Sequence, residues 1–225
     1  FTKDNFVRFV DAGLKGGLGG GAITGGTHVL FGKGPEKART TQDQRQTILD
    51  SLTHGMEEPA GLFGDLEGGH AVTFASGLAA ATAITSLIPR GGVVVMPTAA
   101  YYGVKQIFGN LAEKGLISIR FVDGGNTEEV IKATEGAAVV WMESIANPTL
   151  VVADIPAITA AAKKAGALSV VDATFATPVR QKPISMGADI VLQSATKFIG
   201  GHSDLLLGAV ICKSKEHATK MVGYR

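Results

Sequence analysis

Two hydroxyl side chains and a lysine follow a short apolar run near the end of the chain. The run, residues 188–193, reads Ala-Asp-Ile-Val-Leu-Gln and predicts a buried strand. Ser194, Thr196 and Lys197 leave this strand together, and two glycines follow them. Lys197, at the exit of a buried strand, is expected to be poorly solvated, and burial lowers the pKa of a lysine. A neutral amine attacks a carbonyl to form a Schiff base. The hydroxyls can bind an anion such as a phosphate, while the glycines let the backbone pass close to a bulky group.

A lysine taken at random lies in a polar surface turn, so Lys197 needs a second observation in its favour. Asp172 supplies one, since it ends another apolar run, residues 168–171. Enzymes that use pyridoxal phosphate need a lysine for the Schiff base and a carboxylate that keeps the pyridine nitrogen protonated. Asp172 alone would equally suit a helix cap or an ion pair, and only the pairing with Lys197 favours the catalytic interpretation.

Three segments in a fixed order resemble one enzyme family. They are residues 171–178 (Val-Asp-Ala-Thr-Phe-Ala-Thr-Pro), 187–191 (Gly-Ala-Asp-Ile-Val) and 194–204 (Ser-Ala-Thr-Lys-Phe-Ile-Gly-Gly-His-Ser-Asp). They are similar to the cystathionine γ-synthase/γ-lyase group, the pyridoxal-phosphate enzymes of cysteine and methionine metabolism. The resemblance covers roughly residues 66–212. It implies an aspartate-aminotransferase-like (fold type I) large cofactor domain, which is an α/β domain with a mostly parallel sheet flanked by helices.

The resemblance also implies which residues hold pyridoxal 5'-phosphate. The expected catalytic residues are Lys197, Tyr101 and Asp172, with Tyr101 stacked on the cofactor ring and helping with proton transfer. The expected cofactor-binding residues are Ser76, Gly77, Leu78, Tyr101, Glu143, Asn147, Asp172, Thr174, Ser194, Thr196 and Lys197. No metal site is expected, because His202, Asp204 and Cys212 would form a poor ligand set.

Simpler interpretations exist for several of these residues. Ser76 opens an alanine-rich helix and could be only its N-cap, although a helix N-terminus after a strand also binds phosphate well. Tyr101 could be a packed aromatic at a domain edge. Asn147 precedes a proline, and Asn-Pro by itself is a turn signal. The family usually has glycine where Tyr102 stands.

Strands and helices alternate from residue 71 onward. The expected strands are residues 71–75, 93–96, 117–122, 138–142, 168–171, 190–193 and 207–211. The expected helices are residues 78–88, 104–114, about 127–134 with Asn126 as the cap, and 155–164 closed by Gly166. Continuous apolar strands that alternate with helices predict a mostly parallel sheet covered on both faces, with sites beyond the carboxyl ends of the strands.

The first 65 residues are expected to form an N-terminal arm, glycine-rich and partly irregular, before a cofactor domain over residues 66–225. The glycine-dense stretch 13–26 fits neither the Walker nor the dinucleotide spacing, which disfavours a dehydrogenase. A short helix is expected over 42–52 and a polar loop around 54–58. The family's Tyr-Ser-Arg motif, which reaches the neighbouring subunit's cofactor phosphate, has no evident counterpart here. The family's smaller C-terminal domain is absent from the sequence given.

Composition narrows the classes of partner. The net charge is +1, so no nucleic-acid partner is expected, and the apolar runs are too short to predict a membrane span. The single cysteine, Cys212, ends an apolar run and is expected to be a small core residue in a cytoplasmic protein. The resemblance implies a homo-oligomer, a dimer or a tetramer, and a small sulfur-containing amino acid as substrate.

The resemblance further implies cleavage of a C–S bond by β- or γ-elimination in a cystathionine- or methionine-like amino acid. One alternative is γ-replacement, as in cystathionine γ-synthases and O-acylhomoserine sulfhydrylases. A second alternative is a non-catalytic relative or fragment that still binds the cofactor. The residues quoted above belong to a cofactor core that elimination and replacement enzymes share.

Overall fold

The structure, a computed structural model, describes residues 59–224 of the chain. The glycine-dense stretch 13–26, the helix expected over 42–52 and the loop expected around 54–58 lie outside the described residues. The division into an arm (1–65) and a cofactor domain (66–225) stays a prediction, because most of the arm is not described.

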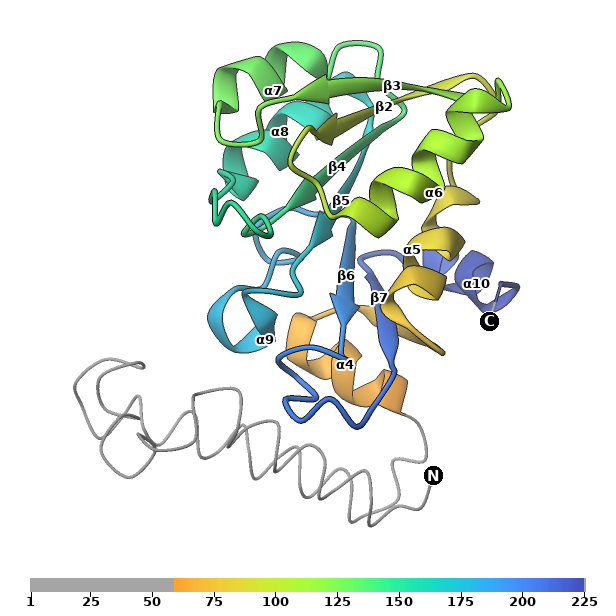
Figure 1. The fold of residues 1–225 in the computed structure, drawn as a ribbon, viewed down its shortest axis with the longest axis vertical. Coiled ribbons are helices and arrows are strands. Elements are labelled where there is room, and N and C mark those ends of the chain that lie inside the picture. Colours follow the sequence, from red (N-terminus) through yellow and green to blue (C-terminus); the bar gives the residue numbers. More distant parts are fainter. Residues whose placement is uncertain (1–58, 225) are drawn as a thin grey trace, which may run out of the picture.

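A seven-stranded sheet runs through the centre of the described region, in the order β1-β7-β6-β5-β4-β2-β3 (Figure 1). The strands are β1 (His70–Phe74), β2 (Gly92–Pro97), β3 (Ile117–Val122), β4 (Val139–Glu143), β5 (Leu168–Asp172), β6 (Ile190–Ser194) and β7 (Gly208–Cys212). Strands β3, β2, β4, β5 and β6 pair in parallel, and β7 is antiparallel to both β1 and β6. The predicted mostly parallel sheet is confirmed.

Helices cover both faces of this sheet. They are α4 (Pro59–Glu67), α5 (Gly77–Thr85), α6 (Tyr102–Glu113), α7 (Thr127–Ala133), α8 (Ile155–Ala165), α9 (Thr177–Arg180) and α10 (Lys215–Val222). Side chains alternate along each strand, so Val139 and Trp141 pack with α5, α6 and α10, whereas Val140 and Met142 pack with α4, α7 and α8. None of the helices described here is long and apolar enough to cross a membrane.

Each predicted strand is present within one residue of its expected bounds. The helix expected over 78–88 ends earlier, at Thr85, because the next three N–H groups bond to carbonyls three residues back and tighten the backbone before Pro89. Asn126 and Gly166 cap α7 and α8 as predicted, with Gly166 in the left-handed conformation. Cys212 is fully buried in β7, which confirms it as a core residue.

Three helices were not predicted: α4, α9 and α10. Of these, α4 crosses the boundary drawn at residues 65 and 66, and its last residue, Glu67, is buried under the sheet. Gln193 of β6 donates from Nε2 to Oε1 of Glu67 at 2.8 Å. The other oxygen of each side chain, Oε2 of Glu67 and Oε1 of Gln193, is buried and has no hydrogen-bond partner among residues 59–224. Burial raises the pKa of Glu67 to about 7, so this carboxyl holds a proton to near-neutral pH.

Candidate active site

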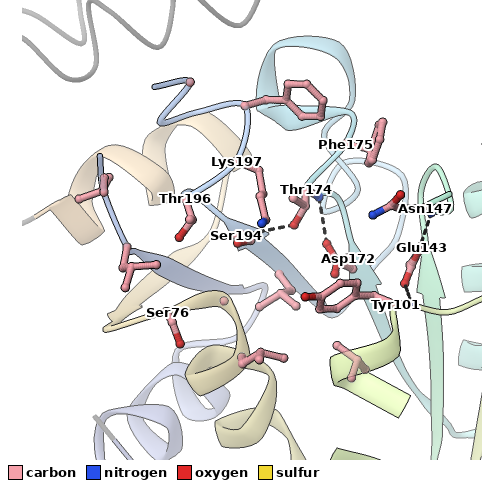
Figure 2. A pocket seen from close by; sticks show the side chains of 18 of the residues that line it. Ser76, Tyr101, Glu143, Asn147, Asp172, Thr174, Phe175, Ser194, Thr196 and Lys197 are labelled. Atoms are coloured by element: carbon pink, nitrogen blue, oxygen red, sulfur yellow. Dashed lines mark hydrogen bonds between the residues drawn. The ribbon is translucent and has the colours of Figure 1, made fainter. Parts of the chain in front are cut away.

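A cavity of about 1300 Å³ opens at the edge where β4, β5 and β6 end. Glu143, Asp172 and Ser194 are the last residues of these strands, so their side chains reach the same opening (Figure 2). The cavity brings together every residue that the sequence predicts near a cofactor: Ser76, Gly77, Leu78, Tyr101, Glu143, Asn147, Asp172, Thr174, Ser194, Thr196 and Lys197. Segments more than a hundred positions apart in the chain therefore share one pocket.

Asp172 is held from within its own loop. The backbone N–H of Thr174 donates to Oδ1 of Asp172 at 3.0 Å, and the Thr174 side chain also bonds to this carboxyl. The Thr174 hydroxyl oxygen accepts from the backbone N–H of Ser194 at 2.9 Å, which joins the end of β5 to the end of β6. Burial raises the pKa of Asp172 and outweighs the lowering by the bonds from Thr174. A cation beside Asp172 would favour its charged form.

The N-terminus of α5 lines one end of the cavity. The Ser76 side chain accepts from the N–H of Ala79 at 3.1 Å, so it caps the helix as one alternative proposed. The N–H groups of Gly77 and Leu78 precede the first intrahelical bond and have no acceptor within α5. A Cβ on Gly77 would lie 2.7 Å from Oγ of Ser194, so only glycine lets the helix start come this close to β6.

Ser194 and Thr196 differ in what their hydroxyls do. Among the described residues, nothing hydrogen-bonds to the Ser194 hydroxyl, which faces the cavity. The Thr196 hydroxyl oxygen instead accepts from the N–H of Leu207 at 3.0 Å and lies 3.3 Å from the Leu207 carbonyl oxygen. Thr196 thus ties the turn after β6 to the start of β7, while Ser194 keeps a free donor for an anion.

Lys197 lies in that turn, and its side chain is exposed to the cavity. The turn is closed by two backbone bonds, Lys197 N–H to Ser194 O at 3.0 Å and Gly201 N–H to Lys197 O at 2.7 Å. Figure 2 shows Lys197 extending from the turn toward Ser194 and Thr174. The expected poor solvation of Lys197 is not found, because the residue lies in the turn after β6 and is exposed at the cavity.

Glu143 is buried and uses both carboxylate oxygens on backbone donors. The N–H of Tyr101 donates to Oε1 at 2.5 Å, and the N–H of Asn147 donates to Oε2 at 3.2 Å (Figure 2). The pKa of Glu143 is raised to about 7, first by burial and then by the neighbouring Asp172 carboxylate, against the lowering by these two bonds. The carboxylate therefore binds backbone at the rim of the cavity.

Tyr101 and Leu78 lie side by side at the cavity rim, and Gly103 makes room for both. A Cβ on Gly103 would lie 2.9 Å from Cδ2 of Leu78 and 3.0 Å from Cε1 of Tyr101. Tyr102, which stands where the family usually has glycine, is exposed and accepts from Gln106 at 2.6 Å. Because Tyr102 bonds along its own helix and does not line the cavity, it adds no crowding there.

Some lining residues were missed. Phe175 and Phe198 form an edge-to-face pair with ring centroids 5.1 Å apart, and both line the cavity beside the predicted polar residues. Leu205 and Leu206 line it from the loop before β7. Each phenylalanine is the sequence neighbour of a predicted site residue, and this position was the available signal. An apolar side chain gave no chemical reason to predict it in the site.

Comparisons with known proteins agree with this geometry. A family model described as "Cys/Met metabolism PLP-dependent enzyme" matches residues 61–224. A cystathionine beta-lyase of Lactococcus lactis subsp. cremoris (strain MG1363) is 42% identical over 170 residues, which cover 75% of this chain and 44% of that relative. A cystathionine gamma-lyase of Bacillus subtilis (strain 168) is 40% identical over 184 residues, covering 81% of this chain and 46% of the relative.

Solved structures show the same fold. The cystathionine gamma synthase from Xanthomonas oryzae pv. oryzae, solved in complex with cystathionine, superposes with a TM-score of 0.70 at 35% identity, over 73% of this chain and 43% of the other. The expected fold type I cofactor domain is thereby confirmed. The chain spans less than half the length of these relatives. Taken with the site's geometry, these matches show that the chain belongs to the pyridoxal-phosphate-dependent enzyme family of cysteine and methionine metabolism.

Proposed function

We propose that the cavity binds pyridoxal 5'-phosphate and that the whole protein cleaves a C–S bond of a cystathionine-like amino acid by elimination. One observation carries the proposal. Lys197, Asp172 and the N-terminus of α5 come from separate parts of the chain and line one cavity, so an amine, a carboxylate and an anion site face the same space. These are the three groups that pyridoxal phosphate needs from a protein.

The donors present fit the cofactor's two charged ends. The free N–H groups of Gly77 and Leu78, with the hydroxyl of Ser194, suit a phosphate at a helix N-terminus. Asp172 has a pKa raised by burial, and a protonated ring nitrogen is the cation that would favour its charged form. Asn147 lines the cavity with an amide that can donate to the phenolic oxygen. Thr174 and Glu143 act through the residues that they hold.

Each protein group has a task in the proposed reaction. When bound, pyridoxal phosphate supplies a sink for the electrons left on the substrate Cα. Asp172 would keep the proton on the ring nitrogen, and Tyr101 would stack on the ring. Lys197 takes the proton from Cα through Nζ and returns a proton later in the reaction. The C–S bond then breaks, the sulfur leaves as a thiol, and hydrolysis releases a 2-oxo acid and ammonia.

One consideration favours elimination over replacement. Elimination needs Lys197, Tyr101 and a leaving group, whereas replacement must also hold and orient a second nucleophile. Gly103 occupies the place where methionine γ-lyases typically have cysteine, and a side chain there would crowd Leu78 and Tyr101. This favours cystathionine-type over methionine-type substrates. Two of the similar proteins are named lyases and one a synthase, so γ-replacement is the second candidate.

The test uses the full-length protein loaded with pyridoxal phosphate. Borohydride reduction and peptide mapping are expected to place a pyridoxyl group on Lys197, and a pyridoxyl group on another lysine would overturn that assignment. Incubation with L-cystathionine is expected to release a 2-oxo acid and ammonia. A thioether formed only from an acylated homoserine and a thiol would favour replacement instead. No product in either assay, with the cofactor bound, would favour a non-catalytic relative.

The assembly of the whole protein is part of the same proposal. We expect a homo-oligomer, a dimer or a tetramer, with residues 66–225 as the cofactor domain and the N-terminal arm outside it. This expectation rests on the family to which the chain belongs. Sedimentation of the full-length protein measures this, and a monomer at micromolar concentration would contradict it.

A further inference from the structure

The side chain of Glu143 joins two chain segments that lie on either side of it in the sequence. Tyr101 begins α6 after β2, and Asn147 lies in the loop after β4. Their backbone N–H groups donate to different oxygens of the same carboxylate, at 2.5 and 3.2 Å. The side chains of both residues line the cavity, whereas the oxygens of Glu143 are occupied by backbone donors.

A carboxylate is well suited to the position of Glu143, between the N–H groups of Tyr101 and Asn147. It offers two acceptor oxygens and no donor when ionised, so it can serve two N–H groups at once. Its charge also suits the start of α6, because α6 has no side-chain cap of its own and Tyr101 is the N-cap residue. Asp172 across the strand pair and Lys105 on α6 are the charged groups that act on Glu143. An amide here would offer one oxygen and would turn an NH₂ toward a second donor.

We propose that Glu143 is a positioning residue whose carboxylate holds the Tyr101 ring and the Asn147 amide at a fixed spacing around the cofactor ring. This inference rests on the proposed function, since it assigns the ring-facing roles to Tyr101 and Asn147. It differs from the role that the sequence resemblance implies for Glu143, namely direct binding of the cofactor. Removal of the Glu143 carboxylate would therefore act on the cofactor through Tyr101 and Asn147.

The test compares Glu143→Gln with Glu67→Gln in the full-length protein. Glu67 is equally buried and also has a pKa raised to about 7, but it pairs with Gln193 and does not line the cavity. Three properties are measured: the affinity for pyridoxal phosphate, the visible absorbance spectrum of the bound cofactor across pH, and kcat and KM for L-cystathionine. Thermal unfolding of the cofactor-free variants reports folding separately.

Glu143→Gln is expected to shift the absorbance maximum or its pH profile and to lower kcat by roughly tenfold to a hundredfold, with a smaller change in KM. Glu67→Gln is expected to leave the spectrum unchanged. Glu143→Asp keeps two acceptors on a shorter side chain and should restore part of the wild-type spectrum. If Glu143→Gln does not fold, Glu143→Asp takes its place in the test. A spectrum of Glu143→Asp that differs in part from the wild type supports the proposal, and a spectrum identical to the wild type overturns it.

The outcomes separate this inference from the proposed function. A wild-type protein that binds no pyridoxal phosphate would defeat the proposed function, whatever the variants do. A wild-type protein that binds it, with a Glu143→Gln variant identical in spectrum and kcat, would defeat only the role of Glu143. An equal spectral change in Glu67→Gln would also defeat it, because burial of any glutamate would then explain the effect.

Discussion

Glu143 and Asp172 lie directly opposite each other as the last residues of the parallel strands β4 and β5. Two carboxylates so placed disfavour each other's ionisation, and Asp172 contributes to the raised pKa of Glu143. The two differ in what holds them. Glu143 accepts from the backbone of two other segments, while Asp172 is bonded within its own loop and faces the cavity. Glu143 thus supports the backbone of the site, whereas Asp172 is the residue proposed to contact the cofactor ring.

The first prediction concerns Asp172→Asn. The amide cannot hold a proton on a pyridine nitrogen, so we expect the variant to fold and to lose turnover by at least about tenfold, the effect of one charged hydrogen bond. Asp154→Asn is the matched control, because Asp154 caps α8 away from the cavity and asparagine caps equally well. Steady-state rates of both variants decide, and a near-normal rate for Asp172→Asn would make this residue purely structural.

The second prediction concerns Gly77→Ala. The added methyl group would meet Cβ and Oγ of Ser194 at 2.7 Å and push the helix start away from β6, a strain of roughly 1–3 kcal/mol. We expect the affinity for pyridoxal phosphate to fall by about tenfold, measured by titrating cofactor-free protein. Gly109→Ala in α6 is the control, since a Cβ there meets nothing within 4 Å. Equal affinities of the two variants would argue against a phosphate at α5.

The third prediction concerns the pH dependence of stability through Glu67. Its pKa is about 7 in the folded protein against an ordinary 4.5, so between these values the folded state binds more protons than the unfolded state. Rising pH therefore lowers the free energy of unfolding across this window, in total on the order of 3 kcal/mol, and the effect ends above about pH 7. The stability that the neutral carboxyl provides is complete at low pH.

Glu67→Gln should remove this contribution and still fold, because an amide oxygen can accept from Gln193 as Oε1 of Glu67 does. Urea denaturation at several pH values is the measurement, with the exposed Asp65→Asn on the same helix as the control. A pH slope in Glu67→Gln equal to that of the wild type would show that Glu67 is ionised in the folded protein.

The fourth prediction concerns the core under α6. Phe108 is fully buried and packs edge-to-face on Trp141 with ring centroids 5.3 Å apart. Phe108→Ala should lower the free energy of unfolding by about 3–5 kcal/mol. Phe121→Ala on β3 is the control, since Phe121 is 51% exposed and its loss should matter far less. Circular dichroism during urea unfolding measures both, and similar values would contradict the assigned packing.

The sequence predicted the strands well because each is a short apolar run ended by a turn. Its failures have physical causes. The helix α10 was missed although Ser214 caps it by accepting from the N–H of His217, because it is short and polar and buries only Ala218 and Met221. The helix α4 was missed because glycines within it, like those of residues 13–26, are typical of irregular backbone. Its last residue, Glu67, bonds to Gln193, which lies far along the chain.

The site was predicted as a set of residues, and the cavity brings that whole set together. What could not be predicted is how the residues divide their tasks. Thr196 bonds to Leu207 while Ser194 stays free, although both are hydroxyls that leave the same strand. Such a difference depends on which backbone groups pass nearby in three dimensions, and residue types do not encode that.

The placement of β7 between β1 and β6 determines when β1 can join the sheet. Among the described strands, β1 pairs with β7 alone, and a side chain at Gly208 of β7 would overlap the carbonyl of Ser76. A growing chain makes β1 early, and that strand has no place in the sheet until residues 208–212 have been made. Lys197 and Asp172 are synthesised before then, so a nascent chain has both groups before the helix start beside them is seated. The proposed phosphate site at the N-terminus of α5 is therefore completed only when β7 joins the sheet.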